Sequence, residues 1–184
     1  IAYVIENNNG MYDLYIEGNK IYFPTNSTNF FAFMKNVTNF ENINFVNTSN
    51  VENFSNIFQG MINLESIDLS GLNTSNVKNM NGLFKGCDSL KKINLSNLDT
   101  SKVESMVQTF VCKNLEKIDI SNFNMNNLKN IENMFLNTQS LVEIDISSIE
   151  FKTLEKYENL FYFAKNIPRT IYVKDVYAKE IVQS

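Results

Sequence analysis

The 184-residue sequence contains no histidine and only two cysteines. Without histidine, the chain lacks the commonest general base and the commonest metal ligand of proteins. Cys87 and Cys112 are too few for a disulfide scaffold, and no apolar run reaches the roughly 18 residues that span a bilayer. The six glycines are scattered rather than grouped in a phosphate-binding loop. We therefore expect no enzyme, no cofactor, no metal site and no membrane insertion by this chain.

Charge and composition narrow the class further. Hydrophobic residues make up 43% of the chain and charged residues 20%, with a net charge of −4. This composition is typical of a folded soluble protein, and the lack of a long basic run argues against nucleic acid as a partner. Asparagine is abundant, which we interpret partly as a coding bias. Residues 1–184 are predicted to form one domain and to be monomeric.

What the chain does contain is a repeat. An apolar residue, an acidic or amide residue and a second apolar residue recur at steps of 24, 26, 25 and 26 residues. The triplets are Ile43-Asn44-Phe45, Ile67-Asp68-Leu69, Ile93-Asn94-Leu95, Ile118-Asp119-Ile120 and Ile144-Asp145-Ile146. A period in this range predicts a solenoid, in which each unit buries its apolar face against its neighbours.

Each repeat carries two apolar periods. Ile67 and Leu69 alternate with polar residues, which predicts a strand with one face inward. The stripe Val77, Met80, Leu83 and Phe84 predicts a short helix, and the preceding Asn73–Asn76 is rich in helix-capping side chains. The expected fold is an α/β leucine-rich-repeat solenoid of about five to six strand-turn-helix coils.

The ends of the chain are predicted to cap this array. Residues 1–34 would form an N-terminal cap with a degenerate first unit, and residues 1–23 within it a three-stranded β-meander with Asn/Gly turns. Residues 35–168 would form the repeats. Residues 169–184 would form a C-terminal strand-helix cap, with a strand over Thr170–Val173 and a closing helix over Val176–Val182.

Residues that alternate outward along the strands would form columns on a concave face. The candidate ligand-binding residues in these columns are Ser66, Asp68, Lys92, Asn94, Lys117, Asp119, Glu143 and Asp145. The alternative is that the Asp, Asn and Ser columns only solvate the sheet face and hydrogen-bond along it. A calcium site is not expected, because stacked carboxylates point in parallel instead of converging on one ion. Cys87 and Cys112 share a repeat position, and we favour buried free thiols over an inter-coil disulfide.

The repeat resembles a known family. Leu64–Phe84 reads Leu-x-x-Ile-Asp-Leu-Ser-x-Leu-Asn-Thr-Ser-Asn-Val-x-x-Met…Phe, and Phe84–Leu90 reads Phe-x-Gly-Cys-x-x-Leu. Both are similar to the repeat of BspA-like bacterial surface proteins and mycoplasma-type lipoproteins. The similarity is closest over residues 47–146. One residue is missing between Phe110 and Leu115 relative to the preceding unit.

The resemblance implies a cell-surface or secreted protein of a low-GC bacterium, with its signal or anchor outside this sequence. It further implies adhesion, so we expect binding to a host extracellular or cell-surface protein or glycan, or to neighbouring cells, through the repeat surface. A structural spacer that displays or anchors other domains is the alternative. A glycan-active enzyme ranks last, because no catalytic set is present.

Overall fold

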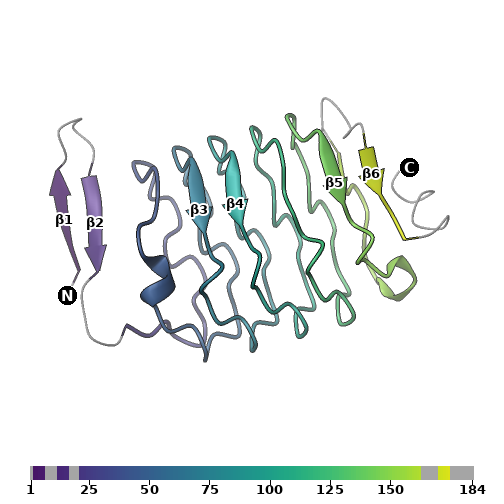
Figure 1. Ribbon diagram of the computed structural model, residues 1–184, viewed down its shortest axis with the longest axis horizontal. Coiled ribbons are helices and arrows are strands. Elements are labelled where there is room, and N and C mark those ends of the chain that lie inside the picture. The colour runs from purple at the N-terminus through teal and green to yellow at the C-terminus, as the bar shows by residue number, and fades with distance from the viewer. Residues whose placement is uncertain (1, 7–11, 17–20, 163–169, 175–184) are drawn as a thin grey trace.

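The computed structural model describes residues 2–6, 12–16, 21–162 and 170–174. The strands are β1 (Ala2–Glu6), β2 (Tyr12–Ile16), β3 (Ser66–Asp68), β4 (Lys92–Asn94), β5 (Glu143–Asp145) and β6 (Thr170–Tyr172). The 3-10 turns are η1 (Ile43–Phe45) and η2 (Phe151–Thr153). Long segments of turns and extended backbone join these elements, and these segments wind in successive coils of similar shape (Figure 1).

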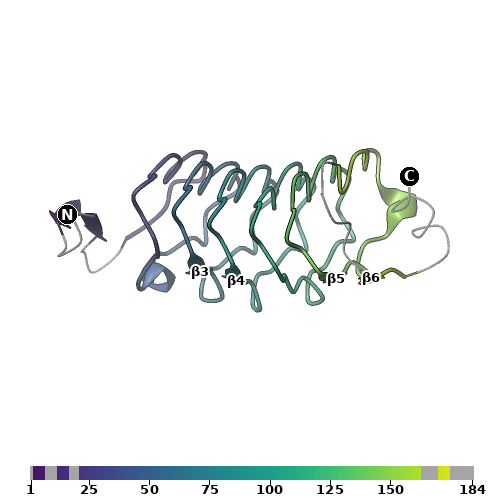
Figure 2. The same cartoon turned by 90° about the horizontal axis from the view of Figure 1, so that it is seen from above.

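Successive repeats lie side by side as a row of coils (Figures 1 and 2). Strand β3 pairs with β4 in parallel, with Ile67 opposite Ile93. On another side of the coils, parallel bridges join Asn26, Asn53, Asn79, Ser105, Asn130 and Lys156 in sequence. Each repeat therefore contacts the repeats directly before and after it, and one period of the sequence forms one coil.

The predicted α/β leucine-rich-repeat solenoid is wrong. No α-helix occurs among the described residues, and their strands form only two-stranded sheets. The stretch from Val77 to Phe84, for which the apolar spacing predicts a helix, is a succession of turns. Its amides alternate between two kinds of partner: Met80 and Gly82 donate to carbonyls of the next coil, whereas Leu83 donates to the Met80 carbonyl three residues back.

Backbone geometry explains why a helix does not form there. Gly82 has φ of 61°, and the equivalent Asn56, Gln108, Asn133 and Asn159 have φ between 54° and 57°. A left-handed residue in every repeat interrupts an α-helix, and glycine and asparagine tolerate this conformation best. Turns closed between residues i and i+3 also place apolar residues three apart. The spacing that suggested a helical stripe therefore fits consecutive turns equally well.

The predicted helix-capping segment has another role. Asn73 accepts a hydrogen bond from the Ser75 amide at 3.1 Å within its own turn. The Thr74 side chain is buried, and its hydroxyl donates to the Asp99 carbonyl of the next coil at 2.9 Å. Thr48 and Thr100 make the same contact one coil earlier and one coil later. These side chains tie neighbouring coils together instead of capping a helix.

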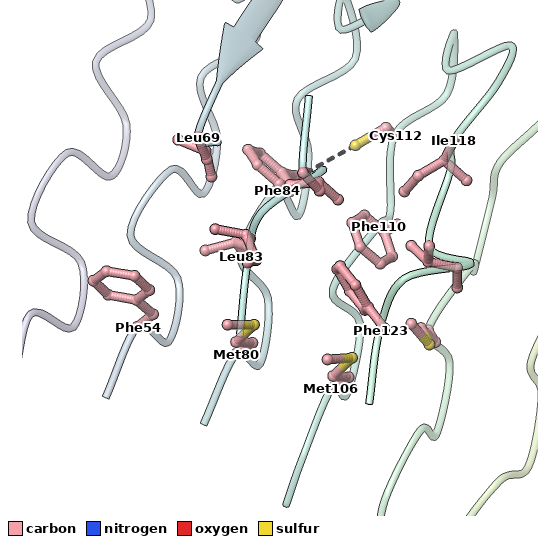
Figure 3. Packing of buried hydrophobic residues seen from close by; sticks show 14 of the residues in the cluster. Phe54, Leu69, Met80, Leu83, Phe84, Met106, Phe110, Cys112, Ile118 and Phe123 are labelled. Atoms are coloured by element: carbon pink, nitrogen blue, oxygen red, sulfur yellow. Dashed lines mark hydrogen bonds between the residues drawn. The ribbon is translucent and has the colours of Figure 1, made fainter. Parts of the chain in front are cut away.

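A stack of phenylalanine rings runs through the core. The rings of Phe31, Phe58, Phe84, Phe110, Phe135 and Phe161 follow one another at centroid distances of 5.3–6.2 Å and interplanar angles of 9–21°. Figure 3 shows Phe84 and Phe110 among the buried Met80, Leu83 and Met106. Offset stacking of this kind adds to the hydrophobic gain of burial. All six rings are buried, and Phe84, which the sequence places in an apolar stripe, lies in the middle of the stack.

Strands β3 and β5 bury the residue that alternation predicted, whereas Ile93 of β4 is half-buried. In β3, Ile67 is buried between exposed Ser66 and Asp68, and Leu69 is buried just beyond. The first repeat departs from this pattern, because η1 turns Phe45 outward and leaves it 80% exposed. The tight 3-10 turn thus changes the face on which an otherwise equivalent residue lies.

The two ends differ from the prediction in part. Strands β1 and β2 form the antiparallel hairpin that was expected, with Val4 opposite Leu14. The third strand of the predicted meander is wrong, since Tyr22 bridges Asn47 in parallel and belongs to the first coil. The predicted C-terminal strand is confirmed as β6, which pairs with β5. The predicted helix over Val176–Val182 lies outside the described residues. Within the described ranges, no helix has the length and apolar character needed to cross a membrane.

Candidate functional site

The outward residues of the strand segments lie on one face, as alternation predicted. Lys92 is opposite Ser66, and Asn94 is opposite Asp68. Lys117 bridges Glu143, which in turn is opposite Thr170. All of the candidate residues are exposed except Asp145, which is half-buried. The candidate site therefore forms rows across neighbouring coils. Their role in binding stays a prediction.

The acidic and amide row has a local structural role. Asp68 and Asp119 each accept the backbone N–H of the serine two residues later, at 2.8 and 3.0 Å, and Asp119 also accepts the Ser121 hydroxyl at 2.6 Å. Asn94 accepts the equivalent amide at 3.2 Å and Asp145 at 2.9 Å. The side chains therefore close turns within their own coil, as Asx residues commonly do. The hydrogen bonds from Ser70 and Ser121 lower the pKa of Asp68 and Asp119 respectively.

We expect Asp119→Asn to remove part of the acid sensitivity of the fold. The folded pKa of Asp119 is lowered relative to its ordinary value, chiefly by the Ser121 hydroxyl and then by the Ser121 amide. This stabilisation is therefore present above about pH 4 and is lost as the pH falls through the folded pKa. An asparagine side chain at this position would still accept the amide, as Asn94 does, but would not titrate. Urea unfolding from pH 7 down to pH 3 should show the stability difference between wild type and variant shrinking, and a constant difference would contradict this assignment.

The strand ladder is interrupted in the middle of the row, in addition to the unpaired η1 segment of the first repeat. Neither a bridge nor a backbone hydrogen bond joins residues 91–95 to residues 116–120, all of which the structure describes. On one side of this step β3 pairs with β4, and on the other side Lys117 forms a parallel bridge with Glu143. The Asn122 side-chain amide spans the interruption by donating to the Ser96 carbonyl at 2.7 Å. The adjacent coils thus separate locally on the strand face while staying paired elsewhere.

The interruption coincides with the short return loop. In the preceding coil, the Cys87 amide donates to the Phe84 carbonyl three residues back at 3.1 Å. In the short loop, the Cys112 amide donates to the Phe110 carbonyl only two residues back at 2.8 Å. The missing residue removes the left-handed position that Gly86 occupies with φ of 76°. We infer that the tighter turn shifts the strand segment that follows it out of register with β4.

An open groove of about 600 Å³ lies over the interruption. Its apolar floor consists of Ile93, Ile118 and Ile144. Its polar lining consists of Lys91, Lys92, Lys117, Asp119, Ser121, Glu143, Asp145 and Tyr172. A smaller hollow of about 140 Å³ continues from it over Asn94, Ser96 and Asn122. The groove brings together five of the eight candidate residues; Asn94 lines the smaller hollow, and Ser66 and Asp68 line neither.

The groove is lined by charged side chains of both signs. Lys91, Lys92 and Lys117 lie on the two coils that flank the interruption, and in the described chain their ammonium groups have no hydrogen bond or ion pair. Glu143 and Asp145 lie on the next coil. The Tyr172 hydroxyl is hydrogen-bonded to Glu143, which raises the pKa of Tyr172. One open surface thus presents three lysines on two coils, with Asp119 beside Lys117, and two carboxylates with a phenol on the coils that follow.

Sequence reasoning missed Lys91 and the groove itself. The available signal was the step of 25 residues between Ile93 and Ile118, which differs from the steps of 26 on either side. The sequence shows the shorter loop, but not its effect on the pairing of the next strand segment. Alternation does not identify Lys91, because this residue precedes the alternating strand residues.

Comparison with known families places the chain. Residues 25–113 and 66–174 match the family described as "Mycoplasma protein of unknown function, DUF285". The chain belongs to this family. Comparison of the DUF285 chain with curated proteins and with solved structures gave no match.

A charge ladder runs along the coils of the DUF285 protein outside the groove. It consists of Glu52, Lys78, Glu104, Lys129 and Glu155, one residue from each repeat with alternating sign. Lys78 pairs with Glu52 at 2.9 Å and Lys129 with Glu104 at 2.7 Å. The hydrogen bond from Lys129 lowers the pKa of Glu104. These exposed pairs contribute little individually to stability. Pairing of a coil with the coil two repeats away would bring residues of like charge together.

The cysteines of the DUF285 chain do not contribute to a surface site. Both are buried free thiols, as predicted. The Cys112 thiol donates to the Phe84 carbonyl at 3.2 Å (Figure 3), and Cys87 makes the same contact with the Phe58 carbonyl at 3.0 Å. Burial raises the pKa of Cys87 to about 12. A thiol with such a pKa is a poor nucleophile. Over the described ranges, no three or more His, Cys, Asp or Glu side chains gather as a metal site would require.

Proposed function

We propose that this chain is a non-catalytic binding module of a bacterial cell-surface or secreted protein. In this proposal, it adheres to a host extracellular or cell-surface macromolecule, or to a neighbouring cell, through the strand-face groove. The observation that carries it is the open groove with three lysines that make no ion pair there. Charged groups without an internal partner are available to an external one and steer its approach.

Two further features support binding over catalysis. Ser121 lines the groove, and its hydroxyl donates to Asp119 within its own turn, so the fold holds this hydroxyl in place. The apolar floor between charged walls is also a common arrangement at recognition surfaces.

A screen of the purified chain against extracellular matrix proteins, cell-surface proteins and glycans would test this proposal. We expect at least one reproducible partner, which the Lys92→Glu/Lys117→Glu variant should bind about tenfold more weakly. The new glutamates would repel the acidic groups of the partner that contact these lysines in the wild type. Lys152→Glu is the matched control, since it reverses an exposed charge outside the groove. Absence of any partner, or equal weakening by the control, would contradict the proposal.

A structural spacer is the second candidate. It is favoured by the phenylalanine stack, which continues through six coils and would keep the row of coils straight. A spacer predicts that cell attachment of the full-length protein changes when coils are deleted, but stays the same when groove charges are reversed. The two candidates are therefore separated by the same Lys92→Glu/Lys117→Glu variant.

A further inference from the structure

The geometry points to an extended peptide segment of mixed charge as the ligand of the groove, with acidic side chains over Lys91, Lys92 and Lys117 and a basic side chain over Glu143. This inference rests on the proposed binding function and specifies the chemistry of the partner. It starts from the order of charges across neighbouring coils, which is lysine, lysine and glutamate at positions 92, 117 and 143.

The presence of both signs of charge selects against several ligand classes. A polymer with only negative charges, such as a sulfated glycan or a nucleic acid, would meet the lysines favourably but would also face Glu143, Asp145 and Asp119 in the same groove. A polymer with only positive charges would face the lysines. Like-charge contacts of this kind are unfavourable at interfaces. A segment that carries both signs is the ligand whose charges match both kinds of groove residue.

The dimensions fit an extended peptide. Neighbouring coils that pair as strands lie about 4.8 Å apart, and the step between Lys92 and Lys117 is unpaired, so about 10 Å is the minimum separation of Lys92 and Glu143 along the row. An extended peptide rises about 3.3 Å per residue, and its acidic and basic residues would therefore be at least about three residues apart. The half-buried Ile93 side chain on the floor would contact an apolar residue between them.

Several charged side chains of the groove are available to bind such a ligand. The lysines have no ion-pair partner within the described chain. Asp119 and Asp145 are already engaged with the backbone of their own turns. Glu143 is exposed and, unlike Asp145, does not close a turn; its hydrogen bond with the Tyr172 hydroxyl leaves further acceptor positions on the carboxylate. It is therefore the expected contact for the basic residue of the peptide.

The experiment uses the full chain and fluorescein-labelled peptides of equal length. Their central sequences are Glu-Glu-Val-Lys-Lys (mixed), Glu-Glu-Val-Glu-Glu (acidic) and Lys-Lys-Val-Lys-Lys (basic). Fluorescence anisotropy at about 50 mM salt, where surface charges are weakly screened, should give a dissociation constant for the mixed peptide about tenfold lower than for either other peptide. Glu143→Lys should reverse the preference towards the acidic peptide.

Charge exchange provides the decisive control. Lys92→Glu/Lys117→Glu should lose the mixed peptide, and adding Glu143→Lys to that variant should restore it, because the peptide can then bind in the opposite direction. Lys152→Glu should bind like wild type. Circular dichroism and thermal unfolding would verify that each variant is folded.

The inference is overturned if the acidic peptide binds wild type as tightly as the mixed peptide, or if a sulfated polysaccharide displaces the mixed peptide without preference for its charge order. These results are distinct from failure of the proposed function. A partner from the screen that is lost on Lys92→Glu/Lys117→Glu, together with equal binding of the three peptides, would reject the mixed-charge peptide and leave the binding function standing.

Discussion

Replacing Phe84 with alanine is expected to lower the free energy of unfolding by about 3–5 kcal/mol. The Phe84 ring is fully buried and stacks on Phe58 at 5.5 Å and on Phe110 at 6.2 Å. Its removal leaves a cavity in the middle of the row of coils and breaks the stack into two halves. Coils on either side cannot collapse into the gap, because backbone hydrogen bonds fix their spacing.

Phe45→Ala is the matched control, because it removes the same side chain from a position that is 80% exposed. Surface substitutions of this kind change stability by about 0.5 kcal/mol or less. Urea unfolding followed by circular dichroism would compare the two variants. Equal losses of unfolding free energy in the two variants would mean that the stacked phenylalanine rings do not stabilise the core as proposed.

Inserting one glycine after Val111 is expected to weaken binding of the mixed-charge peptide by about tenfold or more, or about 1.4 kcal/mol. The insertion changes Phe-Val-Cys to Phe-Val-Gly-Cys and gives the return loop the length and glycine position of Phe84–Cys87. A residue free to adopt positive φ would then be available where Gly86 lies in the coil before. The strand segment around Lys117 could move into register with β4 and close the groove.

Hydrogen exchange at the Leu95 and Glu116 amides would report on the restored pairing, since amides in a strand ladder exchange slowly. The control is a glycine inserted between Ile62 and Asn63, which lengthens a return loop that already has the full number of residues and that precedes β3, outside the groove. In this control, the Leu95 amide should still exchange rapidly, and the peptide should still bind. Retention of binding after insertion at Val111, with new protection at Leu95, would separate the groove from the binding site and contradict the prediction.

Asparagine illustrates where composition alone misleads. Its abundance suggests in part a coding bias, yet asparagine occupies left-handed positions such as Asn56 and Asn133 and closes turns at Asn53 and Asn79. A repeat built from consecutive turns needs many residues that tolerate positive φ or that accept a nearby backbone amide. In this chain asparagine supplies both properties.

The candidate site was predictable in its residues but not in its shape. Alternation identified Lys92, Lys117 and Glu143 as outward-facing, because side chains of a strand segment point to opposite faces in turn. It could not reveal that the pairing lapses between two particular coils. That depends on how a loop one residue shorter positions the next segment, and this involves hydrogen bonds to a neighbouring coil.

The sequence by itself determined the period, the inward columns and the outward rows of charge. These follow from burial, since an apolar residue repeated at a constant interval must face a common core. Only the tertiary structure decided that the segment from Val77 to Phe84 forms turns instead of a helix, and where the groove opens. In both cases the backbone amides have partners in the adjacent coil, and residues about 26 positions away in the chain therefore determine the local conformation.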